Sequence, residues 1–150
     1  MMMNNKREQV LVEARQWLGT PYRHQCSVKL MGADCLGLIR GVWRALYGNE
    51  PEETPNYSAD WGEVGSRETM LEAANVWFDP VSFDAVLPGD LLIFRWQNMS
   101  IAKHAGILSG DDTFIHAYEK GGVVETTLGH YWKKRVAACF AFPAVDELES

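Results

Sequence analysis

Long apolar segments are absent from this chain of 150 residues, and basic residues are outnumbered. No apolar run approaches the roughly 20 residues that a membrane-spanning helix needs, so we expect no membrane insertion. Met1 to Arg7 lack the apolar core and cleavage site of a signal peptide. Fourteen basic residues face 20 acidic ones, which gives a net charge of −6. A negative surface does not attract nucleic acid or anionic lipid, so neither is an expected partner.

Cysteine is also scarce, with Cys26, Cys35 and Cys139 only. An odd number at these spacings does not predict a disulfide scaffold. Cys139 lies in an apolar stretch and is predicted to be a buried strand residue. A regulatory disulfide between Cys26 and Cys35 remains an alternative to two free thiols.

Apolar periodicity predicts helices first and strands second. Helices are expected at about 8–18, 34–47 and 67–77, with Ser66 capping the third and a loop at 49–62. Turn signals such as Pro88-Gly89-Asp90 then separate short apolar runs. The expected strands are roughly 81–86, 90–96, 103–108, 113–118, 122–126 and 135–142. This order predicts a single α+β domain over 1–150, with N-terminal helices packed on an antiparallel sheet of about five to six strands.

Cys35 is placed where a polar turn meets an apolar helical pattern. Asp34 is the expected N-cap, so the thiol should lie in the first turn of a helix, where unpaired N–H groups and the helix dipole favour a thiolate. The dipole contributes about 0.3–1 kcal/mol, less than the roughly 1.4 kcal/mol of one pKa unit. A nearby imidazolium would therefore be needed to hold Cys35 mostly as thiolate, and selective alkylation at mildly acidic pH is expected.

Two histidines, His104 and His116, follow on predicted strands, the layout of a thiol hydrolase. Direct opposition of the two requires Leu108 to face Asp112, with a three-residue loop Ser109-Gly110-Asp111 between the strands. A two-residue loop would place them on different faces. We expect Cys35 as nucleophile, His104 as base and His116 as the residue that orients it. The Cys35 N–H and the Tyr22 hydroxyl are the candidate oxyanion donors.

These residues resemble the NlpC-type cell-wall cysteine peptidases, a papain-like family. The resemblance rests on ordered motifs: Thr20-Pro21-Tyr22, Asp34-Cys35-x-Gly37-Leu38, Pro88-Gly89-Asp90-Leu91-Leu92-Ile93-Phe94, His104-Ala105-Gly106-Ile107 and Phe114-Ile115-His116-Ala117. It implies hydrolysis of peptidoglycan stem peptides, at the bond from D-glutamate to a diamino acid such as diaminopimelate, without metal or cofactor. It also implies catalytic roles for Cys35, His104 and His116, with Tyr22 near the nucleophile.

The chain departs from many family members at Leu36, where they carry Ser, and this predicts altered substrate recognition. Asp34, Leu36 and His24 are the substrate-binding candidates; a solvent-facing loop position is the alternative for His24. The segment Trp132–Pro143 and the helix at 67–77 look most like the phage and gene-transfer-agent branch. This implies synthesis in the cytoplasm and delivery to the wall by tail or gene-transfer-agent proteins, with no appended targeting module.

Three alternatives remain open at this point. A non-catalytic module of a tail or wall complex could keep the fold without activity. A thiol amidase or acyltransferase would resolve the same intermediate on another substrate. A zinc site could use Cys35, His104 and His116, since thiolate and imidazole are suitable ligands. The six tryptophans are spread along the chain, which predicts core packing for them.

Overall fold

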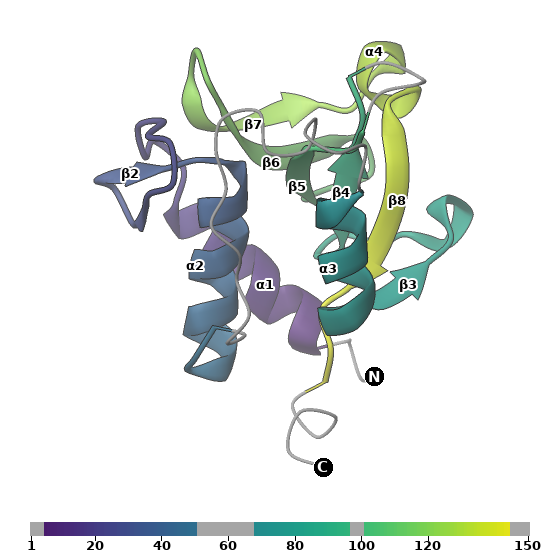
Figure 1. Cartoon of the computed structure of the whole chain (residues 1–150), viewed down its shortest axis with the longest axis horizontal. Coiled ribbons are helices and arrows are strands. Elements are labelled where there is room, and N and C mark those ends of the chain that lie inside the picture. The colour runs from purple at the N-terminus through teal and green to yellow at the C-terminus, as the bar shows by residue number, and fades with distance from the viewer. Residues whose placement is uncertain (1–4, 51–67, 97–100, 145–150) are drawn as a thin grey trace.

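The computed structural model describes residues 5–50, 68–96 and 101–144 (Figure 1). It confirms the predicted α+β class. Six strands form one antiparallel sheet in the order β3-β8-β4-β5-β6-β7, and β1 and β2 form a small second sheet. The helices are α1 (Asn5–Gln16), α2 (Cys35–Tyr47), α3 (Thr69–Trp77) and α4 (His130–Lys133). The strands are β1 (Ser27–Val28), β2 (Gly32–Ala33), β3 (Asp79–Val81), β4 (Leu91–Phe94), β5 (His104–Leu108), β6 (Thr113–Tyr118), β7 (Gly122–Thr127) and β8 (Val136–Ala141).

The two faces of the large sheet carry separate apolar clusters, because side chains alternate along each strand. One face packs against α1 and α2; its buried residues include Ile93, Ala105, Ile107 and Ile115. The other face carries Phe94, Leu108 and Phe114, with the half-buried Trp132 of α4 packed on it. The sheet is therefore covered on both sides, and α2 begins on the first of them.

Helices α1 and α2 approach closely at Gly41. A Cβ atom at this position would lie 2.0 Å from the Trp17 ring, so only glycine fits beneath the indole. Leu38 and Val42, on the same helix, are fully buried. Helix α2 also packs on β5 and β6, which places its first residue, Cys35, beside the sheet.

Strand β4 begins at the predicted turn, and a buried ion pair ties that turn to α1. Gly89 has a φ of +102°, and its N–H donates to the Leu108 carbonyl at 2.7 Å. Asp90 is fully buried and accepts from Arg7 Nε at 2.8 Å and Nη2 at 3.2 Å. It also accepts from the Leu87 N–H at 2.9 Å. The motif thus anchors the first helix to the sheet.

Several element boundaries differ from the sequence prediction. The strand predicted at 81–86 is wrong in part: the strand is 79–81, and Phe83–Ala85 form a 3-10 turn that Ser82 caps through Asp84 N–H. The sequence pattern did not predict this cap, because serine is common in turns and in loops alike. The short helix α4 and the β1–β2 pair were not predicted, since neither is long enough to show periodicity. Ser66 and the loop from residue 51 lie outside the described residues; α3 follows Glu68, whose side chain makes no capping bond.

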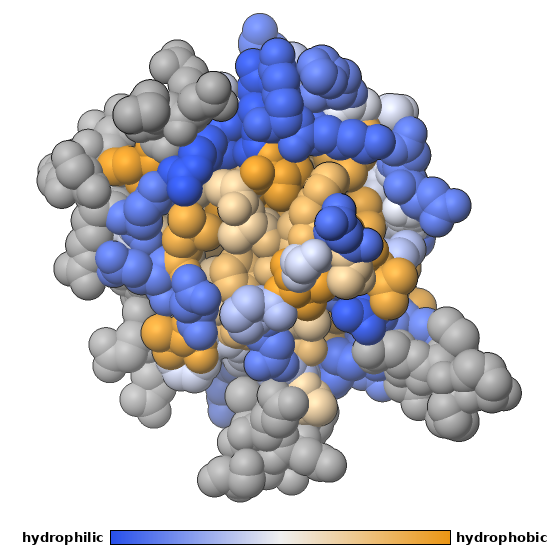
Figure 2. Space-filling model, turned by 90° about the vertical axis from the view of Figure 1, so that its right-hand side faces the viewer, coloured by the Kyte–Doolittle hydropathy of each residue, from blue (hydrophilic) through white to orange (hydrophobic). Residues whose placement is uncertain are grey.

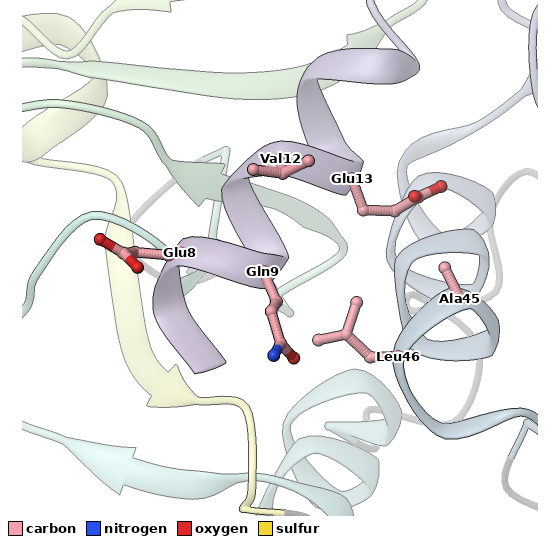
Figure 3. Close-up of a pocket in the computed structure, with 6 residues that line it drawn as sticks. All are labelled: Glu8, Gln9, Val12, Glu13, Ala45 and Leu46. Atoms are coloured by element: carbon pink, nitrogen blue, oxygen red, sulfur yellow. The ribbon is translucent and has the colours of Figure 1, made fainter. Parts of the chain in front are cut away.

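Two hollows lie on the surface away from Cys35. One, of about 460 Å³, lies between α1 and α2, with Val12, Glu13 and Leu46 among its lining residues (Figure 3). The other, of about 470 Å³, lies over β3 and β8, where Figure 2 shows apolar residues gathered inside a hydrophilic rim. Among the described residues, no helix has the length and apolar character needed to cross a bilayer.

Candidate active site

Cys35 is the first residue of α2, and Asp34 caps the helix as predicted. The Asp34 carboxylate accepts from Gly37 N–H at 2.7 Å and, through its second oxygen, from Gln25 N–H at 2.6 Å. The first intrahelical bond runs from Leu38 N–H to the Asp34 carbonyl at 3.0 Å. Asp34 is only 3% exposed. It therefore joins the preceding loop to the helix start and holds the thiol at the end of the helix dipole.

Gly37 explains why this helix start tolerates a crossing loop. A Cβ atom at Gly37 would lie 1.9 Å from the carbonyl oxygen of Cys26, so any side chain would collide with the main chain there. The Ser27 hydroxyl donates to the Gly37 carbonyl at 2.6 Å and secures the same crossing. Cys26 is thus held close to the helix start, but Cys26, Cys35 and Cys139 are all free thiols in this structure.

The Cys35 thiol lies against the main chain at the start of β5, near the residues on either side of His104. Its Sγ contacts the Lys103 carbonyl oxygen at 3.9 Å, and the Ala105 N–H lies close enough to favour the thiolate. Helix α2 packs on β5 and β6, and the thiol therefore lies at the start of β5. The structure brings the predicted nucleophile to the strand that begins with the predicted base, His104.

The two histidines also meet, although not by direct opposition. The β5–β6 register pairs Ile107 with Ile115 and Leu108 with Phe114, which places Gly106 opposite His116. His104 is therefore a diagonal neighbour of His116. The predicted direct pairing of the two residues is wrong, because the register is shifted by two residues. Its imidazole still reaches across: His104 Nε2 lies 2.9 Å from His116 Nδ1.

The loop explains the shifted register. Ser109 N–H donates to the Thr113 carbonyl at 2.8 Å, so these two residues close the hairpin and Gly110–Asp112 form the loop. The predicted odd loop length is confirmed, but the loop begins one residue later than expected. An odd length keeps both histidines on one face. Gly106 lies between them without a side chain, and a Cβ atom there would come within 3.1 Å of His116 Cβ.

Aromatic rings enclose the histidine pair. The His104 ring centroid lies 5.1 Å from that of Trp96, 5.6 Å from Phe94 and 5.9 Å from Trp132. Trp132 also lies 5.1 Å from His116. His104 is 6% exposed and His116 is 1% exposed. Two tryptophans therefore converge on the site, which the even spread of tryptophan along the sequence did not predict.

Sequence reasoning missed one polar partner of this pair. The Thr126 hydroxyl on β7 lies 2.9 Å from His116 Nε2. The available signal was strand alternation: Thr126 pairs with Phe114, which shares its face with His116. Both nitrogens of the His116 ring are thus occupied, one by His104 and one by Thr126.

Burial governs the protonation states. It raises the pKa of Cys35 to about 12, with a further contribution from the Asp34 carboxylate, and the nearby N–H groups of Ala105, Leu36 and Cys35 only partly oppose this. Burial, and then His116, lowers the pKa of His104 to about 3, and burial lowers the pKa of His116 to about 4. These directions favour a neutral Cys35 thiol and a neutral His104 imidazole. The expected thiolate–imidazolium pair at mildly acidic pH is therefore not supported.

Tyr22 lies beside the nucleophile, as predicted. Its main chain bridges to Ala33, and its neighbour Thr20 is fully buried and accepts from Val123 N–H at 2.9 Å through its carbonyl. Burial, followed by the charges of Cys35, Asp34 and Glu119, raises the pKa of Tyr22 to about 12. The phenol therefore stays protonated at neutral pH and can donate a hydrogen bond near the thiol.

This site can be compared with known proteins. A family model described as the NlpC/P60 family matches residues 19–140. The chain belongs to the NlpC/P60 family. Over 130 residues it is 28% identical to "Murein DD-endopeptidase MepS/Murein LD-carboxypeptidase" of Escherichia coli K12, covering 86% of this chain and 59% of that protein. Over 134 residues it is 27% identical to "Gamma-DL-glutamyl hydrolase" of Bacillus subtilis 168, covering 89% of this chain and 29% of that protein.

A solved structure has the same fold. NlpC1 from Trichomonas vaginalis superposes with a TM-score of 0.66 at 20% identity, covering 95% of this chain and 45% of that one. The chain thus spans 59%, 29% and 45% of the lengths of these three proteins, less than two thirds of each. The NlpC/P60 fold is shared, and the sheet that carries His104 and His116 is part of it.

The three predicted substrate-binding residues lie at or near the start of α2, in different environments. In this NlpC/P60 domain Leu36 is half-buried in the first turn of α2. The His24 side chain is 40% exposed, and its Nδ1 lies 3.7 Å from Asp34 Oδ2. The Asp34 carboxylate accepts hydrogen bonds from the Gly37 and Gln25 N–H groups. Within the described part of the chain, no three His, Cys, Asp or Glu side chains are arranged to hold a metal ion.

Proposed function

We propose that this NlpC/P60 chain is a cysteine peptidase that hydrolyses the stem peptides of peptidoglycan. The observation that carries the proposal is the contact of the Cys35 thiol with the carbonyl of Lys103, the residue before His104. The His104 ring Nε2 is in turn bonded to His116 Nδ1 at 2.9 Å. Family membership and the printed names of the murein endopeptidase and the glutamyl hydrolase support it. The mechanism follows from the protonation states of the site.

Attack and proton transfer occur together, because the resting pair is neutral. His104 Nδ1 takes the thiol proton as Cys35 Sγ bonds to the carbonyl carbon of the scissile amide. The oxyanion that forms accepts hydrogen bonds from the Cys35 N–H and the Tyr22 hydroxyl. The charge that develops on His104 is stabilised through His116.

The intermediate then collapses to a thioester. The carbon–nitrogen bond breaks, and His104 returns its proton to the leaving amine. A water molecule next gives its proton to His104 and attacks the thioester carbon. The new carboxylic acid leaves, and the proton on His104 returns to Cys35 Sγ. Each step uses groups of this chain and water alone.

We assign cleavage to the bond between D-glutamate and a diamino acid such as diaminopimelate. The motif resemblance supports this choice, and so does the name of the Bacillus subtilis hydrolase. The name of the Escherichia coli relative specifies other bonds, so the residues around the nucleophile must select among stem peptides. Leu36, half-buried next to Cys35, is the residue we expect to influence that selection, together with His24 and Asp34.

Peptidoglycan digestion tests the function. Purified walls of diaminopimelate and lysine type are incubated with the native chain and with Cys35→Ala, and new termini are identified by mass spectrometry. New D-glutamyl carboxylates with native protein only are the expected result. A null result for both proteins on every wall type favours a non-catalytic module, and transfer to an added amine with little hydrolysis favours an acyltransferase.

We further propose that a phage-like particle delivers the enzyme to the wall. The resemblance of Trp132–Pro143 and of the helix at 67–77 to the phage and gene-transfer-agent branch supports this. In the structure these segments lie together: the Phe78 ring, directly after α3, lies 5.0 Å from Phe142, and Tyr47 donates to the Pro143 carbonyl at 2.5 Å. Co-sedimentation of the chain with induced particles tests delivery; recovery only in the particle-free fraction would contradict it.

A further inference from the structure

The His116 ring is fixed by packing and by two hydrogen bonds. Its centroid lies 4.3 Å from that of Phe114 and 5.1 Å from that of Trp132. Nδ1 bonds His104 Nε2 and Nε2 bonds Thr126 Oγ1, each at 2.9 Å. Packing restrains the plane of the ring, but only the hydrogen bonds distinguish its two nitrogens.

Thr126 reaches the ring through the sheet register. Strand β6 pairs with β7 so that Phe114 faces Thr126 and His116 faces Val124. Thr126 is therefore a diagonal neighbour of His116 on the same face, as His104 is on the opposite side. Two successive diagonal steps across β5, β6 and β7 align His104, His116 and Thr126.

The direction of these bonds follows if His104 acts as base, so this inference rests on the proposed function. To accept the thiol proton at Nδ1, His104 must carry its own proton at Nε2 and donate it to His116 Nδ1. The His116 proton must then be on Nε2, where its acceptor is the Thr126 hydroxyl oxygen. The Thr126 hydroxyl could also donate to His116 Nε2. The His116 proton would then be on Nδ1 and the His104 proton on its Nδ1, so His104 could not act as base.

We propose that Thr126 is a positioning residue for the proton transfer from Cys35. Its oxygen accepts from His116 Nε2–H while His104 becomes charged, and this keeps His116 Nδ1 available as the acceptor for His104. Thr126 touches neither the thiol nor the substrate in this role. It acts through His116 alone, because His116 separates it from His104.

Three variants separate this role from a structural one. Thr126→Val keeps the shape and removes the acceptor, and Thr126→Ser restores the hydroxyl. Thr127→Val is the matched control, because Thr127 is the next residue of β7, is exposed, and points to the opposite face. On stem peptide, Thr126→Val should lower kcat roughly tenfold with little change in KM, as expected for the loss of one hydrogen bond to His116, the residue that orients the base. Thr126→Ser and Thr127→Val should retain kcat.

A second measurement does not depend on turnover. Nitrogen-15 NMR of the imidazoles should show His116 protonated at Nε2 and not at Nδ1 in the native chain, and this single tautomer should be lost in Thr126→Val. If Thr126→Val does not fold, Thr126→Ala takes its place. A native chain that cleaves nothing, yet shows this NMR difference, would overturn the proposed function and leave Thr126 as the orienting group. Unchanged His116 signals and unchanged kcat in the variant would overturn the role of Thr126.

Discussion

His104 and His116 form a 2.9 Å hydrogen bond across a diagonal of the sheet, with Gly106 rather than His104 directly opposite His116. The missing side chain at Gly106 provides the space for this contact, since a Cβ atom there would crowd Phe114 and His116 within 3.1 Å. The two imidazoles are thus paired by the register of one hairpin and by one glycine.

The neutral state of the site predicts how Cys35 responds to pH. Because burial and Asp34 raise its pKa to about 12, the thiolate fraction should increase with pH throughout the accessible range. Alkylation of Cys35 by iodoacetamide should accelerate roughly tenfold per pH unit from pH 7 to 10. Peptide mapping separates Cys35 from Cys26 and Cys139. A rate that is constant from mildly acidic pH upward would show a stable thiolate–imidazolium pair instead.

The buried histidines predict acid destabilisation. Their folded pKa values, about 3 and about 4, lie below the unfolded value of about 6.5. Below pH 6.5 the unfolded chain therefore binds more protons, and the free energy of unfolding falls as pH falls toward 4. Each histidine contributes at most about 1.4 kcal/mol per pH unit.

Urea denaturation at pH 7, 6, 5 and 4 measures this slope. His116→Gln should flatten it, whereas His130→Gln should leave it unchanged, because His130 is exposed. Equal slopes in the native chain and in His116→Gln would mean that His116 is not buried as a neutral group.

Gly37 is predicted to be intolerant of any side chain. A methyl group would have to displace the Cys26 carbonyl, 1.9 Å away, so Gly37→Ala should lower the free energy of unfolding by about 1–3 kcal/mol. It should also slow Cys35 alkylation, because the start of α2 must shift. Gly121→Ala is the control: its Cβ would meet only Val124, at an ordinary 3.5 Å. Equal stability of both variants would contradict the close crossing at Gly37.

The ion pair between Arg7 and Asp90 should matter far more than an exposed one. Arg7→Met leaves the fully buried Asp90 without its partner, and such losses cost about 3–5 kcal/mol. Arg15→Met removes the pair with Glu125, where the two side chains are 44% and 31% exposed, and should cost less than about 1 kcal/mol. Thermal or urea unfolding compares the two. Similar losses would show that Asp90 does not depend on Arg7.

The sequence predicted the parts of this protein that local pattern controls. Alternation together with an odd-length loop predicted that His104 and His116 share one face. The polar turn before an apolar helix identified Asp34 as the cap and Cys35 as a residue of the first helical turn. The exact hairpin register depends on whether the three-residue loop begins at Ser109 or at Gly110. The sequence is compatible with either loop.

The sequence pattern did not predict the long-range packing around His116. Thr126 and Trp132 meet His116 only because β7 and α4 fold back over the same sheet face. The protonation states also depend on that burial. The helix N-terminus and a nearby imidazolium were expected to favour a thiolate at Cys35. Desolvation opposes it by raising the pKa, and no local sequence pattern around Cys35 indicates that burial.

The most direct test of the account is to trap the acyl group on Cys35. The native chain is mixed with a stem peptide that contains D-glutamate and diaminopimelate, quenched in acid within milliseconds to seconds, and mapped by mass spectrometry. The account predicts that the D-glutamyl fragment is attached to the Cys35 peptide, and that Cys35→Ala gives neither adduct nor product. Hydrolysis that persists in Cys35→Ala, or an adduct on another residue, would contradict it.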